Sequence, residues 1–391
     1  MAKLINTRSP FYVKYTDNDP TYTLNSVNLR IYIYSGESGD YSGALEYTIE
    51  KAVIGGVDYV VFEISELIRD FIDVKYDGEY DSYIKWVRLL ATGSDTDGNS
   101  VIIDPSSAIY YLATEGYGYF EEGINPDFDE GLMMSEGTIY RINDRSVNIP
   151  VSAETTNSVA FRLNGETVYS TTISDDGDTN QKIQYIASDS NSTADSYRER
   201  VLEAGGIFED NSLLEAFEDE IDIGQVDEVY INYTNDTETK TKILKVKTFD
   251  CSKYEPIRVT FVNKYGALQD LYFTRRSNES INVQTEDYKA SVIDFANLSY
   301  DTSAHQMRTL NLMGNESITL NTDYIDESCN EHIKQLMLSE QIWMTRLTDE
   351  EKIVPLKLKS NSLQLKKRVN DKLIQYTMEF DVAADKINNI R

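Results

Sequence analysis

Apolar and polar residues alternate most regularly near the C-terminal end of the chain. Within residues 372–382 every second side chain is apolar, namely Ile374, Tyr376, Met378, Phe380 and Val382. One apolar and one polar face is typical of a strand in an antiparallel sheet that covers a core on one side. The pattern predicts a terminal hairpin of residues 363–369 and 372–382, with its turn at Asn370 and Asp371.

Turn residues between apolar runs predict three more hairpins. Asn164–Gly165 separates two short strand-like runs, and a Gly55–Gly56 pair lies within residues 47–63. Both dipeptides tolerate the positive φ that tight hairpin turns need. The runs 341–347 and 353–359 predict another hairpin, across an acidic turn.

The most complete turn signal is Asn-Lys-Tyr-Gly, between the apolar runs 257–262 and 268–274. Its glycine stands where the backbone must reverse. We therefore interpret Asn263, Tyr265 and Gly266 as a structural turn and not as a chemical site.

Two amphipathic helices are predicted among the strands. The first covers residues 65–72, with Ser65 as its N-terminal cap. The second covers residues 324–339, with Thr322 or Asp323 as its cap. The predicted buried stripe of this second helix consists of Ile325, Cys329, Ile333, Leu336 and Met337.

These elements predict a mainly β, multi-domain fold of antiparallel β-sandwich domains, in which each terminal domain has one short amphipathic helix. Residues 1–123 form an N-terminal β domain with one helix. Residues 124–250 form a middle, immunoglobulin-like β module with long polar loops. Residues 251–391 form a C-terminal β domain with one helix and a long basic hairpin.

Charge adds a candidate assembly surface to this picture. The chain has a formal net charge of −29, which excludes wrapping nucleic acid by simple charge attraction. Residues 353–391 nevertheless carry eight Lys and Arg against four Asp and Glu. Such polarity favours contacts between unlike faces. The candidate interface cations are Lys357, Lys359, Lys366, Lys367 and Arg368.

Residue types that carry chemistry are sparse, and the sequence predicts no enzyme, catalytic residue, cofactor or metal. The two histidines and two cysteines do not have metal-site spacing. Cys329 and His332 could pair as a nucleophile and a base, but Cys329 belongs to the buried stripe and His332 to the polar side of the helix.

Two acidic turns, Asp95–Asn99 and Asp175–Asp178, leave calcium binding open beside the simpler interpretation as hairpin turns. A pair of carboxylates for glycoside hydrolysis is also left open by the 66 acidic residues. With only two tryptophans for stacking on sugars, it is the weaker interpretation.

The chain has no apolar run of the length that spans a bilayer and no apolar signal core at its N-terminus. We therefore expect synthesis in a cytoplasm and no membrane insertion.

Several stretches carry a resemblance to a known class of proteins. They are residues 9–12, 62–71, 113–120, 260–273, 275–277 and 320–327, which lie in the first and last thirds of the chain. In these stretches the chain resembles virion structural proteins of tailed bacteriophages that infect Bacteroidota, including crAss-like phages.

The resemblance implies a tail-tube-like fold and a tail hub, tail-tube-like or connector-ring subunit in the virion. Its partners would be copies of itself, forming a homo-oligomeric ring, together with other tail and portal proteins. DNA would pass through the ring without being bound specifically. An acidic lumen suits this role, because it repels phosphate and lets the genome slide.

An alternative function is a glycan-binding or glycan-cleaving module of a tail fibre or surface adhesin. Tyr117, Tyr119 and the acidic turn Asp175–Asp178 are the features that favour it. Receptor fibres usually contain repeats or a coiled-coil stem, and the sequence has neither.

Overall fold

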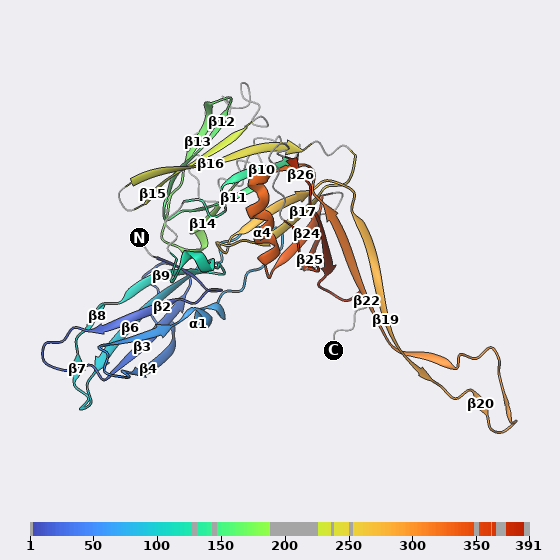
Figure 1. The fold of residues 1–391 in the computed structure, drawn as a ribbon, viewed down its shortest axis with the longest axis horizontal. Helices are drawn as coiled ribbons and strands as arrows, with labels where there is room; N and C mark the ends of the chain where they lie inside the picture. Colours follow the sequence, from blue (N-terminus) through green and yellow to red (C-terminus); the bar gives the residue numbers. More distant parts are fainter. Residues whose placement is uncertain are drawn as a thin grey trace. The chain divides into compact units, whose positions relative to one another are not determined.

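The computed structural model describes residues 3–126, 131–142, 147–187, 226–235, 238–249, 253–347, 352–360, 362–364 and 373–386. The described residues form mainly β-strands in several sheets, most of them antiparallel, with few helical turns (Figure 1). The predicted mainly β, multi-sheet fold is therefore confirmed.

The chain divides into two compact units. Unit 1 contains Met1–Cys251, Thr260–Tyr272 and Ser328–Ser339. Unit 2 contains Ser252–Val259, Phe273–Glu327 and Glu340–Arg391. These units do not coincide with the three predicted segments, because pieces of residues 251–391 belong to each unit. The three-part division stays a prediction.

The first sheet of unit 1 has the strand order β1–β9–β6–β3–β4, and the short β7 pairs with β6. Their bounds are β1 Lys3–Asn6, β9 Ile109–Thr114, β6 Lys85–Ser94, β3 Ser26–Tyr34, β4 Leu45–Ala52 and β7 Ser100–Val101. Val27, Leu29 and Ile31 in β3 are fully buried, as their alternating pattern indicates.

A three-stranded sheet in the order β5–β2–β8 accompanies it, with bounds Tyr59–Glu63, Tyr12–Asp17 and Ile103–Asp104. The predicted hairpin across Gly55–Gly56 is wrong. Both glycines have positive φ, but β4 pairs with β3, and β5 pairs with β2. Turn chemistry fixes a local reversal, whereas the partners of both strands come from elsewhere in the chain.

The second large sheet of unit 1 has the order β10–β16–β15–β12–β13. Its strands are β10 Gly137–Ile142, β16 Glu238–Phe249, β15 Glu228–Asn235, β12 Thr156–Leu163 and β13 Glu166–Thr172. The hairpin predicted at Asn164–Gly165 joins β12 to β13, with φ of 52° and 86° at the two turn residues. This prediction is confirmed. Nearby, β11 (Asn148–Ser152) pairs with β14 (Ile183–Ala187). The 3₁₀ turns η1 and η2 of unit 1 cover Phe120–Glu122 and Thr179–Gln181.

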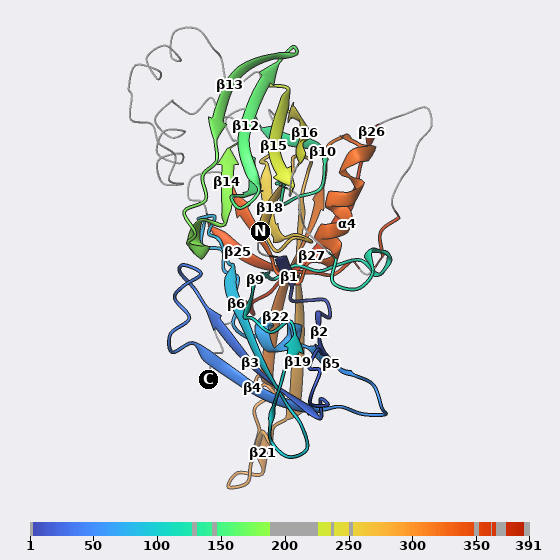
Figure 2. The same ribbon diagram turned by 90° about the vertical axis from the view of Figure 1, so that its left-hand side faces the viewer.

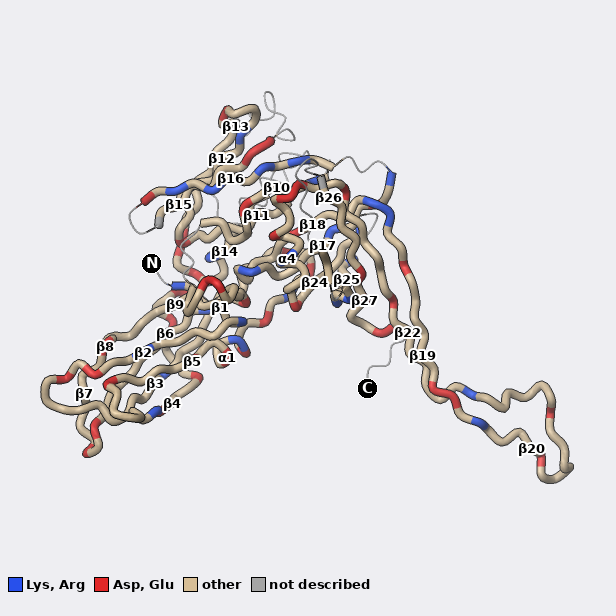
Figure 3. Tube along the Cα trace, viewed as in Figure 1, with Lys and Arg blue, Asp and Glu red and all other residues tan. Residues whose placement is uncertain are grey.

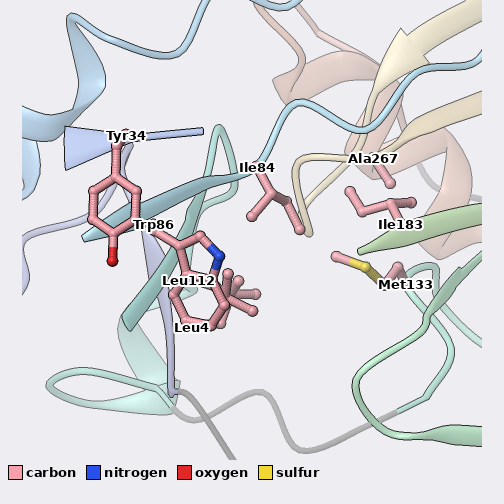
Figure 4. Packing of buried hydrophobic residues seen from close by; sticks show 8 residues of the cluster. All are labelled: Leu4, Tyr34, Ile84, Trp86, Leu112, Met133, Ile183 and Ala267. Atoms are coloured by element: carbon pink, nitrogen blue, oxygen red, sulfur yellow. The ribbon is translucent and has the colours of Figure 1, made fainter. Parts of the chain in front are cut away.

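One apolar cluster joins the parts of unit 1 (Figure 4). Its buried members are Leu4, Tyr34, Ile84, Trp86, Leu112, Met133, Ile183 and Ala267. Beside it lies the side chain of Lys182, which is 2% exposed, pairs with Glu154 and Asp175, and stands 5.3 Å from the Trp86 ring centre. The charge of Lys182 is thus balanced by two carboxylates.

The late strands β17 (Ile257–Val262) and β18 (Leu268–Phe273) form a hairpin across Asn263–Gly266. In unit 2, one sheet includes β24 (Ile342–Arg346), β25 (Ile353–Leu358), β27 (Thr377–Val382), β22 (Met307–Asn321) and β19 (Asn278–Lys289), in that order. The pairing of β24 with β25 confirms the hairpin predicted from 341–347 and 353–359.

The predicted strand 372–382 is divided in the structure. Its beginning is β26 (Leu373–Ile374), which pairs with β23 (Ile325–Asp326), and its end is β27, which pairs with β22 and β25. Ile374, Tyr376, Met378 and Phe380 are buried, as the alternation predicts, whereas Val382 is half-buried. Residues 365–369 of the predicted partner strand and the predicted turn residues Asn370 and Asp371 lie outside the described residues.

Both predicted helices are shorter in the structure than the sequence suggested. Helix α1 covers Ser65–Arg69, and its first flanking residue is Ile64; the Ser65 hydroxyl donates to the Glu63 carboxylate instead of capping the helix. Helix α4 covers Asn330–Leu338 and follows a 3₁₀ turn, η4, at Glu327–Cys329. Thr322 and Asp323 lie before β23, so neither caps α4.

Candidate assembly surface

Strands β19 and β22 continue beyond the other strands of unit 2 as a two-stranded ribbon. The ribbon ends in the short pair β20 (Ile293–Asp294) and β21 (Ser299–Tyr300). Figures 1 and 2 show the two long strands side by side along their whole length. We call residues 281–316 the arm, because β27 pairs with β22 only at residues 317–321.

The arm exposes apolar side chains to an unusual extent. Eleven of the 23 exposed large hydrophobic side chains among the described residues belong to its 36 residues. They are Ile281, Val283, Tyr288, Ile293, Phe295, Leu298, Tyr300, Met307, Leu310, Leu312 and Met313. Exposed apolar side chains that gather in one segment are typical of a site where a protein contacts another molecule.

The register of the ribbon places three apolar side chains on one face, whereas Met313 lies on the other, opposite Gln284. Val283 lies opposite Gly314, and Thr285 lies opposite Leu312, so Ile281, Val283 and Leu312 share one face. The other face carries Asn282, opposite Asn315. We call Ile281, Val283 and Leu312 the apolar row. On a ribbon with water on both faces, such a row is unfavourable unless another layer covers it.

The tip of the arm is held by its own hydrogen bonds. Asp294 accepts hydrogen bonds from the Asn297 side chain and the Ala296 amide, and these bonds hold the pKa of its carboxyl below its usual range. Leu298 follows with a φ of 48°, a value that side-chain-bearing residues rarely adopt, and it is 86% exposed. The tip thus presents a large apolar side chain on a fixed turn.

The arm on its own should have low stability. A two-stranded hairpin alone is marginal in water, and a third strand or a packed layer normally supplies the missing burial. In the arm, β19 is exposed at every residue. An additional layer from another chain would bury both the apolar row and the tip.

The interface predicted from the basic residues stays a prediction, because the structure describes only two of its five cations. Lys366, Lys367 and Arg368 lie outside the described residues. Lys357 is exposed on β25, but Lys359 forms ion pairs with Glu379 and Asp381 at 2.8 and 3.6 Å. Neighbouring carboxylates of unit 2 therefore already balance the charge of Lys359.

The turn Asn263–Gly266 is buried. The Asn263 side-chain amide donates to the carbonyl oxygen of Met133, and its side-chain oxygen accepts from the amides of Tyr265 and Ala267. Gly266 has a φ of 78°, and a Cβ atom there would stand 2.7 Å from the Thr114 Cβ. The turn therefore organises the interior of unit 1 and leaves no room for a ligand.

The features that favoured glycan binding are engaged within the protein. Tyr117 is buried, and burial raises the pKa of its phenol to about 12. The Tyr119 hydroxyl donates to Glu331 at 2.5 Å, and the ammonium groups of Lys264 and Lys334 lie 4.5 and 3.6 Å from its ring centre. Its pKa is raised by burial and by the hydrogen bond to Glu331.

The two acidic turns are also held by local bonds. Asp175 binds Lys182, and Asp95 accepts hydrogen bonds from the backbone and side chain of Asn99. Among the residues that the structure describes, no group of three or more His, Cys, Asp or Glu is arranged to hold a metal ion.

Cys329 and His332 do not form a nucleophilic pair. The buried thiol of Cys329 donates to the Thr138 carbonyl, and a ring nitrogen of His332 lies 2.9 Å from the Ser135 carbonyl. His332 is 1% exposed, so its placement on the polar side of the helix is wrong. Burial lowers the pKa of its imidazole. Within the described part of the chain, no helix is long and apolar enough to cross a membrane.

Sequence reasoning did not identify the arm. The signal that was present is the alternation of Ile281 and Val283 on one strand and of Leu310 and Leu312 on the other. Alternation predicts that one face is covered, but it does not tell whether the cover comes from the same chain.

The comparisons with known proteins assign no family. No family model matches the sequence, and no curated protein matches it. A chain from the tail of an empty GTA particle with C6 symmetry is 16% identical over 34% of this chain and 93% of its own, with a TM-score of 0.23. Extracellular domains 3–5 of Drosophila OTK are 9% identical over 82% and 91%, with a TM-score of 0.21. Similarity at this level transfers neither protein's role to this chain.

Proposed function

We propose that this chain is a non-enzymatic structural subunit of a phage tail, which assembles with copies of itself through the arm. The arm is the observation that supports the proposal, because the apolar side chains of its row and its tip are exposed. The sequence resemblance to phage virion proteins supplies the setting, a tail hub, tail-tube-like or connector ring in the virion. Its partners there would be copies of itself and other tail or portal proteins.

In such a ring the arm of each copy lies on its neighbour. Ile281, Val283 and Leu312 would be buried there, and the hydrogen-bonded tip with Phe295 and Leu298 would pack against the neighbour. Aromatic and aliphatic anchors of this kind contribute most of the binding energy of an interface. The net charge of −29 supports a channel through which DNA passes without specific binding, because repeated acidic subunits repel phosphate.

The test compares two matched sets of substitutions on one strand pair. Ile281→Thr, Val283→Thr and Leu312→Thr together remove the apolar row but keep residues that suit a strand. Asn282→Thr and Gln284→Thr change the opposite face and serve as the control. We expect native mass measurement and negative-stain images to show rings for the wild type and the control, and monomers for the apolar-row variant.

Two outcomes would contradict the proposal. One is a wild-type protein that stays monomeric at high concentration and is missing from purified virions. The other is an apolar-row variant that assembles as the wild type does. Selective binding to a glycan array by the monomer would instead favour the adhesin function.

A further inference from the structure

Lys182 lies between two carboxylates beside the apolar cluster of unit 1, in surroundings unusual for a lysine. Lysine and arginine residues occur in both units (Figure 3). Among the described residues, Lys182 is the one buried lysine, with 2% of its side chain exposed. The cation of the Lys264 ion pair, which is the next most buried, is 12% exposed. A buried ammonium loses its hydration, and its carboxylate partners regain only part of that free energy.

The carboxyl group of Asp175 contacts the Lys182 nitrogen with both of its oxygens. The distances from Nζ are 2.7 Å to Oδ1 and 2.6 Å to Oδ2. The backbone amide of Gly177 donates to Oδ1 at 3.0 Å. This bond places a donor at the oxygen where negative charge develops when a nucleophile adds to the carboxyl carbon. A nucleophile, a carboxyl group and an oxyanion donor thus occur together.

Glu154 brings a second carboxylate to the same nitrogen. Its Oε2 accepts a hydrogen bond from Nζ of Lys182 at 2.7 Å. The Ala153 amide also donates to the Lys182 carbonyl at 2.9 Å, so backbone bonding holds the two segments together. A carboxylate at this position can take a proton from the nitrogen and return it to a leaving group, as a general base and then a general acid do.

Apolar side chains around Lys182 limit the access of water. The ammonium group stands 5.3 Å from the ring centre of Trp86, which is buried. The next residue along the chain, Ile183, is buried in the apolar cluster. One neutral amide costs less to bury than an ammonium together with a carboxylate. Burial therefore favours condensation of the two groups at this site.

We propose that Lys182 and Asp175 join in an isopeptide bond, with Glu154 carrying a proton. The ammonium passes a proton to Oδ2 of Asp175, which leaves a neutral amine and a neutral carboxyl group. The amine nitrogen then attacks Cγ, and the Gly177 amide holds the negative charge that forms on Oδ1. Glu154 takes one proton from the nitrogen and returns it to Oδ2. The bond between Cγ and Oδ2 breaks, and one water molecule leaves.

The product is a covalent ring over residues 175–182, in the segment between β13 and β14. A cross-link of this kind restricts the unfolded chain, as a disulfide does, and so stabilises the folded one. The amide N–H that remains on Lys182 donates to Glu154 in place of the ammonium. The bond lies in unit 1, outside the arm, so the inference stands or falls independently of the proposed function.

Mass spectrometry of the unfolded full-length chain tests the inference. The wild type should be lighter than its sequence by the mass of one water molecule. Trypsin does not cut after an acylated lysine, so the digest should contain residues 163–198 as one peptide that has lost one water. Without the bond, cleavage after Lys182 gives the two peptides 163–182 and 183–198.

Variants separate the covalent bond from the ion pair. Lys182→Arg keeps a cation between the carboxylates but cannot form the bond, so it should have the full mass of its sequence. Glu154→Gln removes the proton carrier and should also have its full mass, with cleavage after Lys182. Glu136→Gln is the matched control, because Glu136 pairs with Lys242 at a more exposed position, and it should lose one water as the wild type does. Circular dichroism verifies that each variant is folded.

The wild-type result decides without any variant, since full mass and cleavage after Lys182 would overturn the inference. Loss of one water with cleavage after Lys182 would overturn it as well, because dehydration at an Asp–Gly pair such as Asp176–Gly177 gives that result. Attachment of the peptide 146–162, which contains Glu154, would contradict the assignment to Asp175. A cross-link that still forms in Glu154→Gln would contradict the role of Glu154.

Discussion

Two hairpins of the late segment, β17–β18 and β19–β22, both contain strands with apolar residues, but they differ in burial. In β17 every residue is buried, and in β18 all but one are. In β19 every residue of the arm strand is exposed. The first hairpin is completed by its own chain, whereas the second has apolar residues that the described part of the chain leaves exposed. Burial by the chain itself separates a structural hairpin from one that we assign to assembly.

The largest difference should appear when a methyl group is added to the buried turn. Gly266→Ala places a Cβ atom 2.7 Å from the Thr114 Cβ and 2.9 Å from the amides of Glu115 and Gly116. Gly55→Ala is the matched control, because its φ of 77° nearly equals the 78° of Gly266 and no atom lies within 4 Å. We expect a loss of at least about 3 kcal/mol for Gly266→Ala and about 1 kcal/mol for the control. Urea unfolding measures both.

Equal losses at the two glycines would contradict this, because the cost would then come from backbone strain alone and the packing around the turn would be immaterial.

A cross-strand pair of the same chemistry occurs in both hairpins and gives the next contrast. The Thr260 hydroxyl donates to buried Asp270 at 2.7 Å, and the Thr309 hydroxyl donates to exposed Asp287 at 2.9 Å. Thr260→Val removes a bond from a buried carboxylate and should cost about 1–3 kcal/mol. Thr309→Val should stay within about 0.5 kcal/mol. Thermal and urea unfolding measure both losses. A larger loss for Thr309→Val than for Thr260→Val would contradict the comparison.

The buried hairpin could be predicted from the sequence because its signals are local. Asn263 and Gly266 stand between two apolar runs, and turn chemistry with apolar strands is sufficient to place a hairpin. At Gly55–Gly56 the same kind of signal led to a wrong pairing, since positive φ reverses the chain but does not choose a strand's partner.

The arm and the candidate interface could not be predicted for a different reason. Alternation at Ile281 and Val283 indicates a covered face, and a single sequence does not distinguish a cover within the chain from a cover in a neighbouring copy. Charge counting led to the cluster around Lys366, which lies outside the described residues and stays a prediction, while Lys359 of the same set pairs with Glu379 in its own sheet.

A falling pH should lower the stability of unit 1 before it affects the arm. His332 lies on α4, and Gln335 of the same helix accepts a hydrogen bond from the Lys264 amide in the buried turn. Burial lowers the pKa of His332, so the unfolded chain binds a proton more readily. Its contribution to stability is present above the unfolded pKa of about 6.5 and is lost as the pH falls below it.

Comparison of the wild type with His332→Gln isolates this effect from that of the carboxylates. Between about pH 7.5 and about pH 5.5 the wild type should lose stability relative to the variant. In the arm, hydrogen bonds lower the pKa of Asp294, so its contribution disappears only as the pH falls below about 4. Asp294→Asn should therefore follow the wild type in the higher range. Parallel curves for the wild type and His332→Gln would contradict the assignment.

The smallest effect on stability is expected for Val283→Thr in the arm. This substitution tests most directly whether the arm serves assembly. Val259 of β17 is fully buried, so Val259→Thr places a hydroxyl in the core and should cost about 1–3 kcal/mol. Val283 is 56% exposed, so Val283→Thr should change the free energy of unfolding of the isolated subunit by no more than about 0.5 kcal/mol. Yet Val283→Thr should weaken assembly, and Val259→Thr should do so only as far as it unfolds the subunit. If Val283→Thr destabilised the monomer as strongly as Val259→Thr, the arm would be packed by its own chain, and the distinction between the two hairpins would fail.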